Sequence, residues 1–212
     1  MSSSDARDAD GAAAPGGAPG GGDEGAGASA GRARISSRRV YSGKVLNLDI
    51  DRVRFPDGSV GELEIIRHSG ASAVVPFLSD PAGDDPQILL IRQYRYAADG
   101  YLYEIPAGRL DEGELPADCA RRELLEETGC TAAALEHLYT MYTTPGFTDE
   151  RIHIFMATGL TRGRTAREAD EFMEVEPMPL TRALALIRDG EIKDAKTALA
   201  ILFAAGFRAA GH

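Results

Sequence analysis

The chain of 212 residues has room for one domain of ordinary size and a small appendage. Its 23 basic and 33 acidic residues give a net charge of −10, which argues against a general nucleic-acid binder, because such a protein needs a basic face to displace counterions. The sequence has two cysteines, Cys119 and Cys130, and no apolar run near the roughly 20 residues of a membrane span. Its N-terminal segment lacks the basic and apolar regions of a secretory signal, so we do not expect it to act as one. We therefore expect a soluble cytoplasmic protein with no nucleic-acid or membrane partner.

The first 31 residues differ in composition from the rest of the chain. Nine of them are Gly and nine are Ala, so few side chains could offset the entropy cost of ordering by burial. We expect a disordered tail over residues 1–34, which is either a solvated leader or an interaction segment.

Strand patterns begin at Ile35. A strand at 53–55, the turn Pro56-Asp57-Gly58 and an alternating strand at 60–66 predict a hairpin. Two continuous apolar runs, 73–78 and 88–91, are typical of buried central strands. Further strands are predicted at 101–105, 135–142, 151–158 and 172–176.

Three helices are predicted between and after these strands. The first has Pro116 in its first turn, Asp118 near the positive end of its dipole, and Gly129 in position to end it. The other two cover 180–189 and about 194–205. Strands and helices mixed in this order predict an α+β or three-layer α/β/α domain.

The first predicted helix carries a cluster of acids. Residues 108–130 read GRLDEGELPADCARRELLEETGC, and Glu123, Glu126 and Glu127 share one face of the helix. Like charges at these spacings repel each other, whereas clustered carboxylates are what Mg²⁺ or Mn²⁺ requires. The alternative is a solvated acidic face with no ligand.

The spacing of the whole segment carries a family resemblance. Gly108, Glu114, Arg122-Glu123-Leu124, Glu126-Glu127 and Gly129-Cys130 match the Nudix box at every position, so the chain resembles the Nudix hydrolases. The resemblance implies an α/β protein: a Nudix-type α/β/α sandwich with a mixed sheet over 72–207, preceded by an N-terminal β-sheet subdomain over 35–71. It also implies hydrolysis of a nucleoside diphosphate linked to another moiety.

The resemblance also implies roles for the residues of the box. Glu123 and Glu127 would be the principal ligands of Mg²⁺, with Mn²⁺ as an alternative metal. Glu126 and the carbonyl oxygen of Ala107 would be further ligands. The motif positions with structural roles would be Gly108, Glu114, Arg122 and Gly129, of which Glu114 and Arg122 would hold the loop and the helix together.

Features outside the box resemble the ADP-ribose pyrophosphatase subfamily. Pro145 lies 16 residues beyond Gly129 within TTPGFTDE, and the segments QYR at 93–95 and YEIPAG at 103–108 look like the strands that enter the box in that subfamily. An ordinary hairpin turn is the alternative for Pro145 and Gly146. The subfamily resemblance implies a homodimer in which the N-terminal β region is exchanged and helps to build the adenosine pocket.

The same resemblance supplies candidates for substrate binding and for the catalytic base. The substrate-binding candidates are Arg67, Arg95, Glu104, Pro145 and Gly146, and the arginine fork suits phosphate oxygens. In the segment READEFMEVEPMPL, 167–180, either Glu168 or Glu171 would accept the proton of the attacking water. The chain has no Trp, so a side chain stacked on the base would be Tyr, Phe or aliphatic.

These observations predict a Mg²⁺-dependent enzyme that splits ADP-ribose into AMP and ribose 5-phosphate. Within the enzyme class, the alternatives are pyrophosphatases for another nucleoside diphosphate sugar or a dinucleotide, such as a GDP-sugar or NADH. From a different class, the alternative is a sensor that binds an ADP-ribose-type ligand without catalysis.

Overall fold

The computed structural model describes residues 33–163 and 173–208. The predicted tail over 1–34 therefore falls almost wholly outside the described residues, and so do both candidate bases, Glu168 and Glu171. None of the described helices has the length and apolarity needed to cross a membrane.

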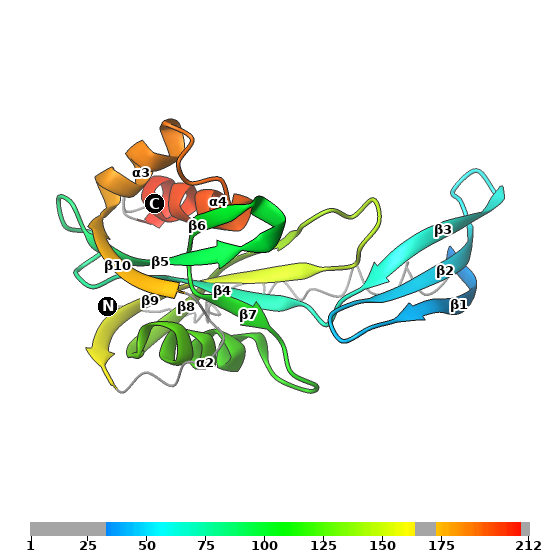
Figure 1. Cartoon of the computed structure of the whole chain (residues 1–212), viewed down its shortest axis with the longest axis horizontal. Helices are drawn as coiled ribbons and strands as arrows, with labels where there is room; N and C mark the ends of the chain where they lie inside the picture. Colours follow the sequence, from blue (N-terminus) through cyan, green and yellow to red (C-terminus); the bar gives the residue numbers. More distant parts are fainter. Residues whose placement is uncertain (1–32, 164–172, 209–212) are drawn as a thin grey trace, which may run out of the picture.

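The described chain forms two bodies of β structure joined end to end (Figure 1). In the first, the strands β1 (Arg34–Ser42), β2 (Asn47–Arg54) and β3 (Val60–Arg67) form an antiparallel sheet in that order. Figure 1 shows this sheet extending away from the helices. The predicted hairpin is confirmed, since β2 and β3 pair from Asn47–Arg67 to Arg54–Val60 around a turn in which Gly58 has φ 86°.

The second body contains two further sheets. One has the order β10-β5-β6 and the other the order β7-β4-β9-β8. Strand β9 runs parallel to β4, and the other paired strands in these two sheets are antiparallel, so the β structure is mixed. The strands are β4 (Ala71–Pro76), β5 (Gln87–Arg95), β6 (Gly100–Glu104), β7 (Ala107–Arg109), β8 (Cys130–Tyr142), β9 (Arg151–Arg162) and β10 (Met173–Pro179).

Helices cover both faces of these sheets (Figure 1). Helix α2 (Pro116–Thr128) lies on one face, and α3 (Leu180–Arg188) and α4 (Ala195–Phe203) lie on the other. Two short helical segments, η1 (Tyr96–Ala98) and η2 (Ala204–Arg208), follow β5 and α4. The predicted three-layer α/β/α sandwich with an added N-terminal β-sheet is confirmed.

The two apolar runs predicted as central strands are buried on both faces. In β4, Ala73 and Val75 pack into the cluster beneath α3 and α4, whereas Val74 packs with Ala120 and Leu124 of α2. Strand β5 alternates in the same way, because successive side chains of a strand point to opposite faces. This continuous double-sided burial explains why neither run shows polar alternation.

Strand β8 is longer than the sequence pattern predicts. It begins at Cys130 rather than at Leu135, because Ala132 and Ala134 pair with Leu160 and Thr158 of β9. Alanine has little preference for strands, so this part of the ladder leaves no clear pattern in the sequence.

Helix α2 begins and ends where its sequence predicts. Pro116 occupies the first turn, and Gly129 ends the helix with φ 71° while its N–H donates to the carbonyl of Leu125 at 2.8 Å. The buried side of the helix includes Ala120 and Leu124, which pack on the sheet, together with two of the acids. The packing of α2 therefore decides which of its carboxylates face the protein interior.

Candidate active site

Two carboxylates on α2 face inward. Glu123 is 8% exposed and Glu127 is 4% exposed, and the two residues lie one helical turn apart. Buried carboxylates are found almost entirely where they are paired or coordinate a metal. Because solvent does not satisfy these two carboxylates, each needs a partner within the protein or a bound cation.

Glycine at position 108 makes room for one of these carboxylates. A Cβ atom at Gly108 would lie 1.8 Å from Oε1 of Glu123 and 2.1 Å from its Cδ. No side chain fits there unless Glu123 moves. The glycine of strand β7 is thus explained by the close approach of the backbone to an acid of α2.

The neighbouring residue holds the second carboxylate. The backbone N–H of Ala107 donates a hydrogen bond to Oε2 of Glu127 at 2.9 Å. Both inward acids of α2 therefore contact strand β7: Glu123 lies against the backbone at Gly108, and Glu127 is hydrogen-bonded to Ala107. The predicted role of the Ala107 carbonyl as a metal ligand stays a prediction.

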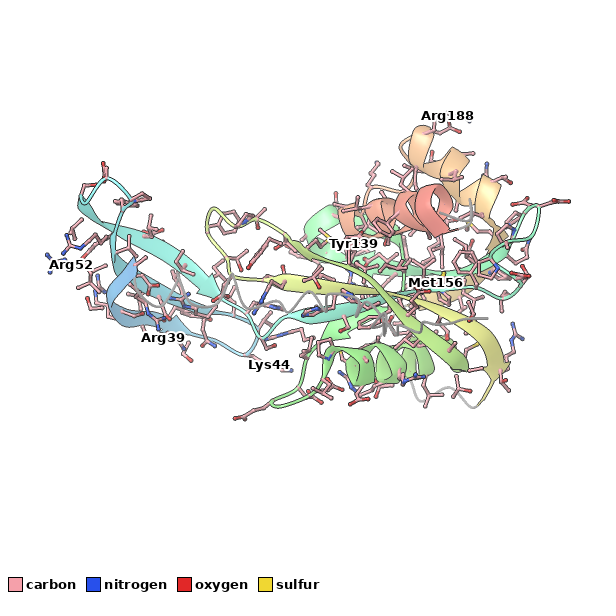
Figure 2. All side chains as sticks on the ribbon, turned by 180° about the vertical axis from the view of Figure 1, so that it is seen from behind. Arg39, Lys44, Arg52, Tyr139, Met156 and Arg188 are labelled. Atoms are coloured by element: carbon pink, nitrogen blue, oxygen red, sulfur yellow. The ribbon has the colours of Figure 1, made fainter. Side chains whose placement is uncertain are left out.

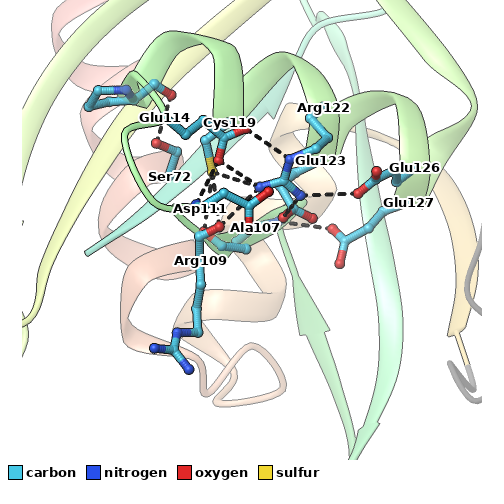
Figure 3. A network of polar contacts seen from close by, with 12 residues as sticks. Ser72, Ala107, Arg109, Asp111, Glu114, Cys119, Arg122, Glu123, Glu126 and Glu127 are labelled. Atoms are coloured by element: carbon cyan, nitrogen blue, oxygen red, sulfur yellow. Dashed lines mark hydrogen bonds and ion pairs between the residues drawn. The ribbon is translucent and has the colours of Figure 1, made fainter. Parts of the chain in front are cut away.

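Arg122 is the centre of the polar network around the box (Figure 3). Its guanidinium donates to both oxygens of Glu114 at 2.9 Å, to Oε1 of Glu123 at 2.6 Å and to Oε2 of Glu126 at 3.2 Å. It also donates to the carbonyl oxygen of Arg109 at 3.0 Å. One cation thus joins the helix to the loop that precedes it and partly neutralises the three acids.

Glu114 completes the connection between loop and helix. It accepts the backbone N–H of Asp111 at 3.0 Å, and the hydrogen bonds from Arg122 lower the pKa of its carboxyl to about 2. Cys119 lies behind this loop as a free buried thiol, and desolvation raises its pKa to about 11. Both groups stay in a single ionisation state across the neutral pH range.

A cavity of about 700 Å³ lies over the inward acids. Of the residues named from the sequence, it brings together Arg95, Ala107, Gly108, Arg122, Glu123, Glu126 and Glu127. It is also lined by four residues that were not chosen as candidates, namely Lys44, Gln93, Arg109 and Asp111. Three of these four lie within or beside the recognised motifs, whereas Lys44 belongs to a turn without a sequence signature.

Arg95 of β5 lines the cavity, and its guanidinium is hydrogen-bonded to a buried carboxylate, that of Glu104. Both nitrogens of its fork, Nε and Nη2, donate to Glu104, at 2.7 and 2.8 Å, and Lys196 at the start of α4 donates to the same carboxylate. Burial raises the pKa of Glu104, but the hydrogen bonds from these two cations outweigh it and leave the pKa below its ordinary value. Glu104 is 2% exposed and does not line the cavity, so any effect on a ligand passes through Arg95.

The other predicted substrate residues lie elsewhere in the single chain. Arg67, at the end of β3, makes ion pairs with Asp49, Asp51 and Asp149. Pro145 and Gly146 lie in the turn between β8 and β9, where the carbonyl of Phe147 accepts the N–H of Ile66 at 2.8 Å. None of Arg67, Pro145 and Gly146 lines the cavity over Glu123.

The acids of α2 fit a magnesium site. Within residues 33–163 and 173–208, no three His, Cys, Asp or Glu side chains form a closed metal cage. Mg²⁺ seldom needs one, since it usually keeps several waters and binds one or two carboxylates together with substrate phosphates. Two inward carboxylates in an open cavity, one of them in a glycine cradle, suit that coordination.

The three-layer fold places an acidic helix beside a cavity suited to a metal-dependent hydrolase, and comparison with known proteins gives the family. Residues 68–199 match the NUDIX domain model, so the chain belongs to the Nudix hydrolase family. It is 41% identical over 171 residues to an ADP-ribose pyrophosphatase of Bacillus subtilis (strain 168), covering 80% of this chain and 90% of the relative.

Two further comparisons bear on fold and substrate. The chain is 35% identical over 155 residues to a GDP-mannose pyrophosphatase of Yersinia enterocolitica serotype O:8 / biotype 1B (strain NCTC 13174 / 8081), covering 69% of this chain and 79% of the relative. A solved structure described as an ADP compounds hydrolase superposes with a TM-score of 0.68 at 22% identity, covering 80% of this chain and 90% of the other. That likeness concerns the fold alone. Nudix hydrolases generally depend on a divalent metal.

Proposed function

We propose that this protein hydrolyses the diphosphate of ADP-ribose to AMP and ribose 5-phosphate with the help of Mg²⁺, for which Mn²⁺ can substitute. The observation that carries the proposal is the pair of inward carboxylates, Glu123 and Glu127, held by Gly108 and Ala107 in a cavity of about 700 Å³. A cavity of that volume is in the range of small-molecule sites.

In the proposed reaction, a water oxygen attacks one phosphorus and the bridging P–O bond breaks. The bridging oxygen stays on the other phosphate, so two phosphate monoesters leave, and the proton of the attacking water passes to a carboxylate base. We assign that base to Glu168 or Glu171, which lie outside the described residues. A carboxylate with an ordinary pKa is ionised at neutral pH and can accept the proton.

The described residues have distinct parts in this proposal. Glu123 and Glu127 would hold Mg²⁺, with Glu126 and the carbonyl of Ala107 as further ligands. The metal supplies charge neutralisation at the phosphates and lowers the pKa of bound water. Arg95 would hold a phosphate or ribose oxygen, and Glu104 would fix its guanidinium through the two hydrogen bonds between them.

We favour ADP-ribose over the other candidate substrates because of the names of the relatives and the segment around Pro145. The Bacillus subtilis relative is named for ADP-ribose and covers four fifths of the chain. A second candidate is GDP-mannose or a similar sugar nucleotide, since another relative at 35% identity is named for that activity. Both substrates share the diphosphate that the acidic helix would address.

We further propose a homodimer in which residues 35–71 reach the Nudix domain of the partner, with 72–207 as the catalytic domain. The N-terminal sheet exposes several large apolar side chains, namely Ile35, Val40, Tyr41, Val60 and Leu63. A three-stranded sheet with exposed apolar side chains gains stability by covering them. In such a dimer Arg67, Pro145 and Gly146 could contribute to the partner's pocket. A monomer at micromolar concentration in light scattering would remove this part of the proposal.

The test of the activity uses purified protein with Mg²⁺ and three substrates in parallel: ADP-ribose, GDP-mannose and NADH. AMP formed fastest from ADP-ribose, and lost on addition of EDTA, is the expected result. Faster turnover of GDP-mannose or NADH would replace the substrate and keep the metal site. Stabilisation by ADP-ribose without any product would favour a sensor. The two buried free thiols and the proposed small-molecule substrate agree with a cytoplasmic location.

A further inference from the structure

The turn between β1 and β2 approaches the active-site loop of the same chain. This turn, residues 43–46, is closed by a hydrogen bond of 2.9 Å from the N–H of Gly43 to the carbonyl of Leu46. Arg109 of strand β7 donates from Nη1 to the carbonyl of Val45 at 2.8 Å, across 64 positions of sequence. The N-terminal sheet is therefore fastened to the strand that carries Gly108.

This contact brings Lys44 to the cavity. Lys44 is exposed on the turn and lines the same cavity as Glu123 and Glu127. Figure 2 shows it at the end of the N-terminal sheet that faces the loop before α2. The exposed side chain of Lys44 therefore lies at the solvent-facing edge of the cavity, whereas Glu123 and Glu127 are buried.

Three arginines line the cavity together with Lys44; two of them have their charge paired with carboxylates, and the third, Arg109, donates to the carbonyl oxygen of Val45. The guanidinium of Arg95 is paired with Glu104, and that of Arg122 is paired with Glu114 and Glu123. Within the part of the chain that the structure describes, the lysine ion pairs are those of Lys196, and none involves Lys44. An ammonium held near a diphosphate site with its donors unused is suited to a phosphate oxygen.

Gln93 is a second polar residue in the wall of the cavity. Gln93 lines the cavity, is 8% exposed, and has a side-chain carbonyl oxygen that is buried without a hydrogen-bond partner among the described residues. A buried acceptor without a donor is unfavourable, so this oxygen gains a donor only through a change in the side chain or its surroundings. Gln93 and Lys44 thus add an amide and a cation to the wall of the cavity over Glu123 and Glu127.

We propose that Lys44 binds a phosphate of the substrate in the cavity of its own chain, so that the turn between β1 and β2 contributes to the site in cis while the exposed apolar side chains of the N-terminal sheet contact the partner. This inference rests on the proposed function, because it needs a phosphorylated substrate over the acids of α2. Lys44 acts on binding in the ground state and the transition state alike. Its loss therefore raises KM and leaves kcat nearly unchanged.

The test compares three variants by steady-state kinetics on ADP-ribose with Mg²⁺. Lys44→Gln should raise KM about 10- to 100-fold, the range for one charge-assisted hydrogen bond, while kcat stays within about threefold. Lys44→Arg keeps the charge and should recover most of the affinity. Lys193→Gln, at an exposed lysine outside the cavity, is the matched control and should behave as wild type. A KM for Lys44→Gln within twofold of wild type would overturn the proposal.

Failure of the proposed function would be visible separately, as absence of AMP with the wild-type protein. Titration calorimetry with ADP and Mg²⁺ then measures the contribution of Lys44 to binding without turnover. Weaker binding of ADP by Lys44→Gln alone supports the phosphate contact. Equal binding of ADP by all variants refutes it.

Co-expression of Lys44→Gln and Glu127→Gln subunits in one dimer tests the cis arrangement. A site with native Lys44 and Glu127 forms in that mixed dimer only if Lys44 acts in trans. Recovered wild-type KM would therefore overturn the cis arrangement, and its absence in a purified mixed dimer supports it.

Discussion

Replacing Gly108 by Ala should separate catalysis from stability. The added methyl would lie 1.8 Å from Oε1 and 2.1 Å from Cδ of Glu123, whereas ordinary contacts begin near 3.4 Å, so the carboxylate must move by about 1.6 Å. The atoms in the way are the far end of a flexible side chain, and φ at Gly108 lies outside the left-handed region. The fold can therefore absorb the methyl by moving Glu123 alone.

The magnitudes follow from this geometry. We expect a loss of about 1 kcal/mol in the free energy of unfolding, at the low end for an overpacked site. A displacement of more than 1 Å in a catalytic group costs on the order of 10²-fold in rate, so kcat/KM on ADP-ribose should fall at least that far. Urea denaturation followed by circular dichroism gives the first quantity, and AMP release gives the second.

Gly100→Ala is the matched control for this substitution. A Cβ at Gly100 meets no atom within 4 Å, and the residue lies outside the cavity, so both quantities should stay near their wild-type values. A folded Gly108→Ala protein with kcat/KM within threefold of wild type would show that the position of Glu123 against Gly108 is not needed for the reaction.

Three further predictions concern single side chains. Glu127→Gln can still accept the N–H of Ala107, so the protein should fold normally while kcat falls on the order of 10³-fold, as measured by AMP release; near-normal turnover would remove Glu127 from the metal site. Because Arg122 depresses the pKa of Glu114 to about 2, this carboxylate stabilises the fold above its unfolded pKa of 4.5, and that contribution is lost as the pH falls from about 4.5 through 2. The urea midpoint should therefore drop more steeply over that range in wild type than in Glu114→Gln, and parallel curves would contradict the assignment. Cys119, with its pKa raised to about 11 by burial, should resist iodoacetamide at pH 8 in the native protein and react after unfolding, as mass spectrometry can record.

The helix that carries the site could be predicted from the sequence because its determinants are local. Pro116 and Gly129 set its ends, and the spacing of Glu123 and Glu127 places them on one face whatever surrounds the helix. The box spacing also gave the family, which the match over 68–199 confirms. The start of β8 was missed for an equally local reason, since the alanines at its beginning have no strand preference.

Only the tertiary structure decided which groups meet around those acids. Glu104 is joined to Lys196 across 92 positions, and Arg109 is joined to Val45 across 64, so neither contact has a local pattern that could reveal it. Strand pairing and helix packing bring these segments together. As a result, Arg67 forms ion pairs with three aspartates, and Lys44 lines the cavity. The sequence by itself determined the acidic helix and its family, because spacing along a helix is a local property. The positions of Lys44, Gln93 and Arg95 around the acidic helix depend on contacts between remote parts of the chain, and only the folded protein defines these contacts.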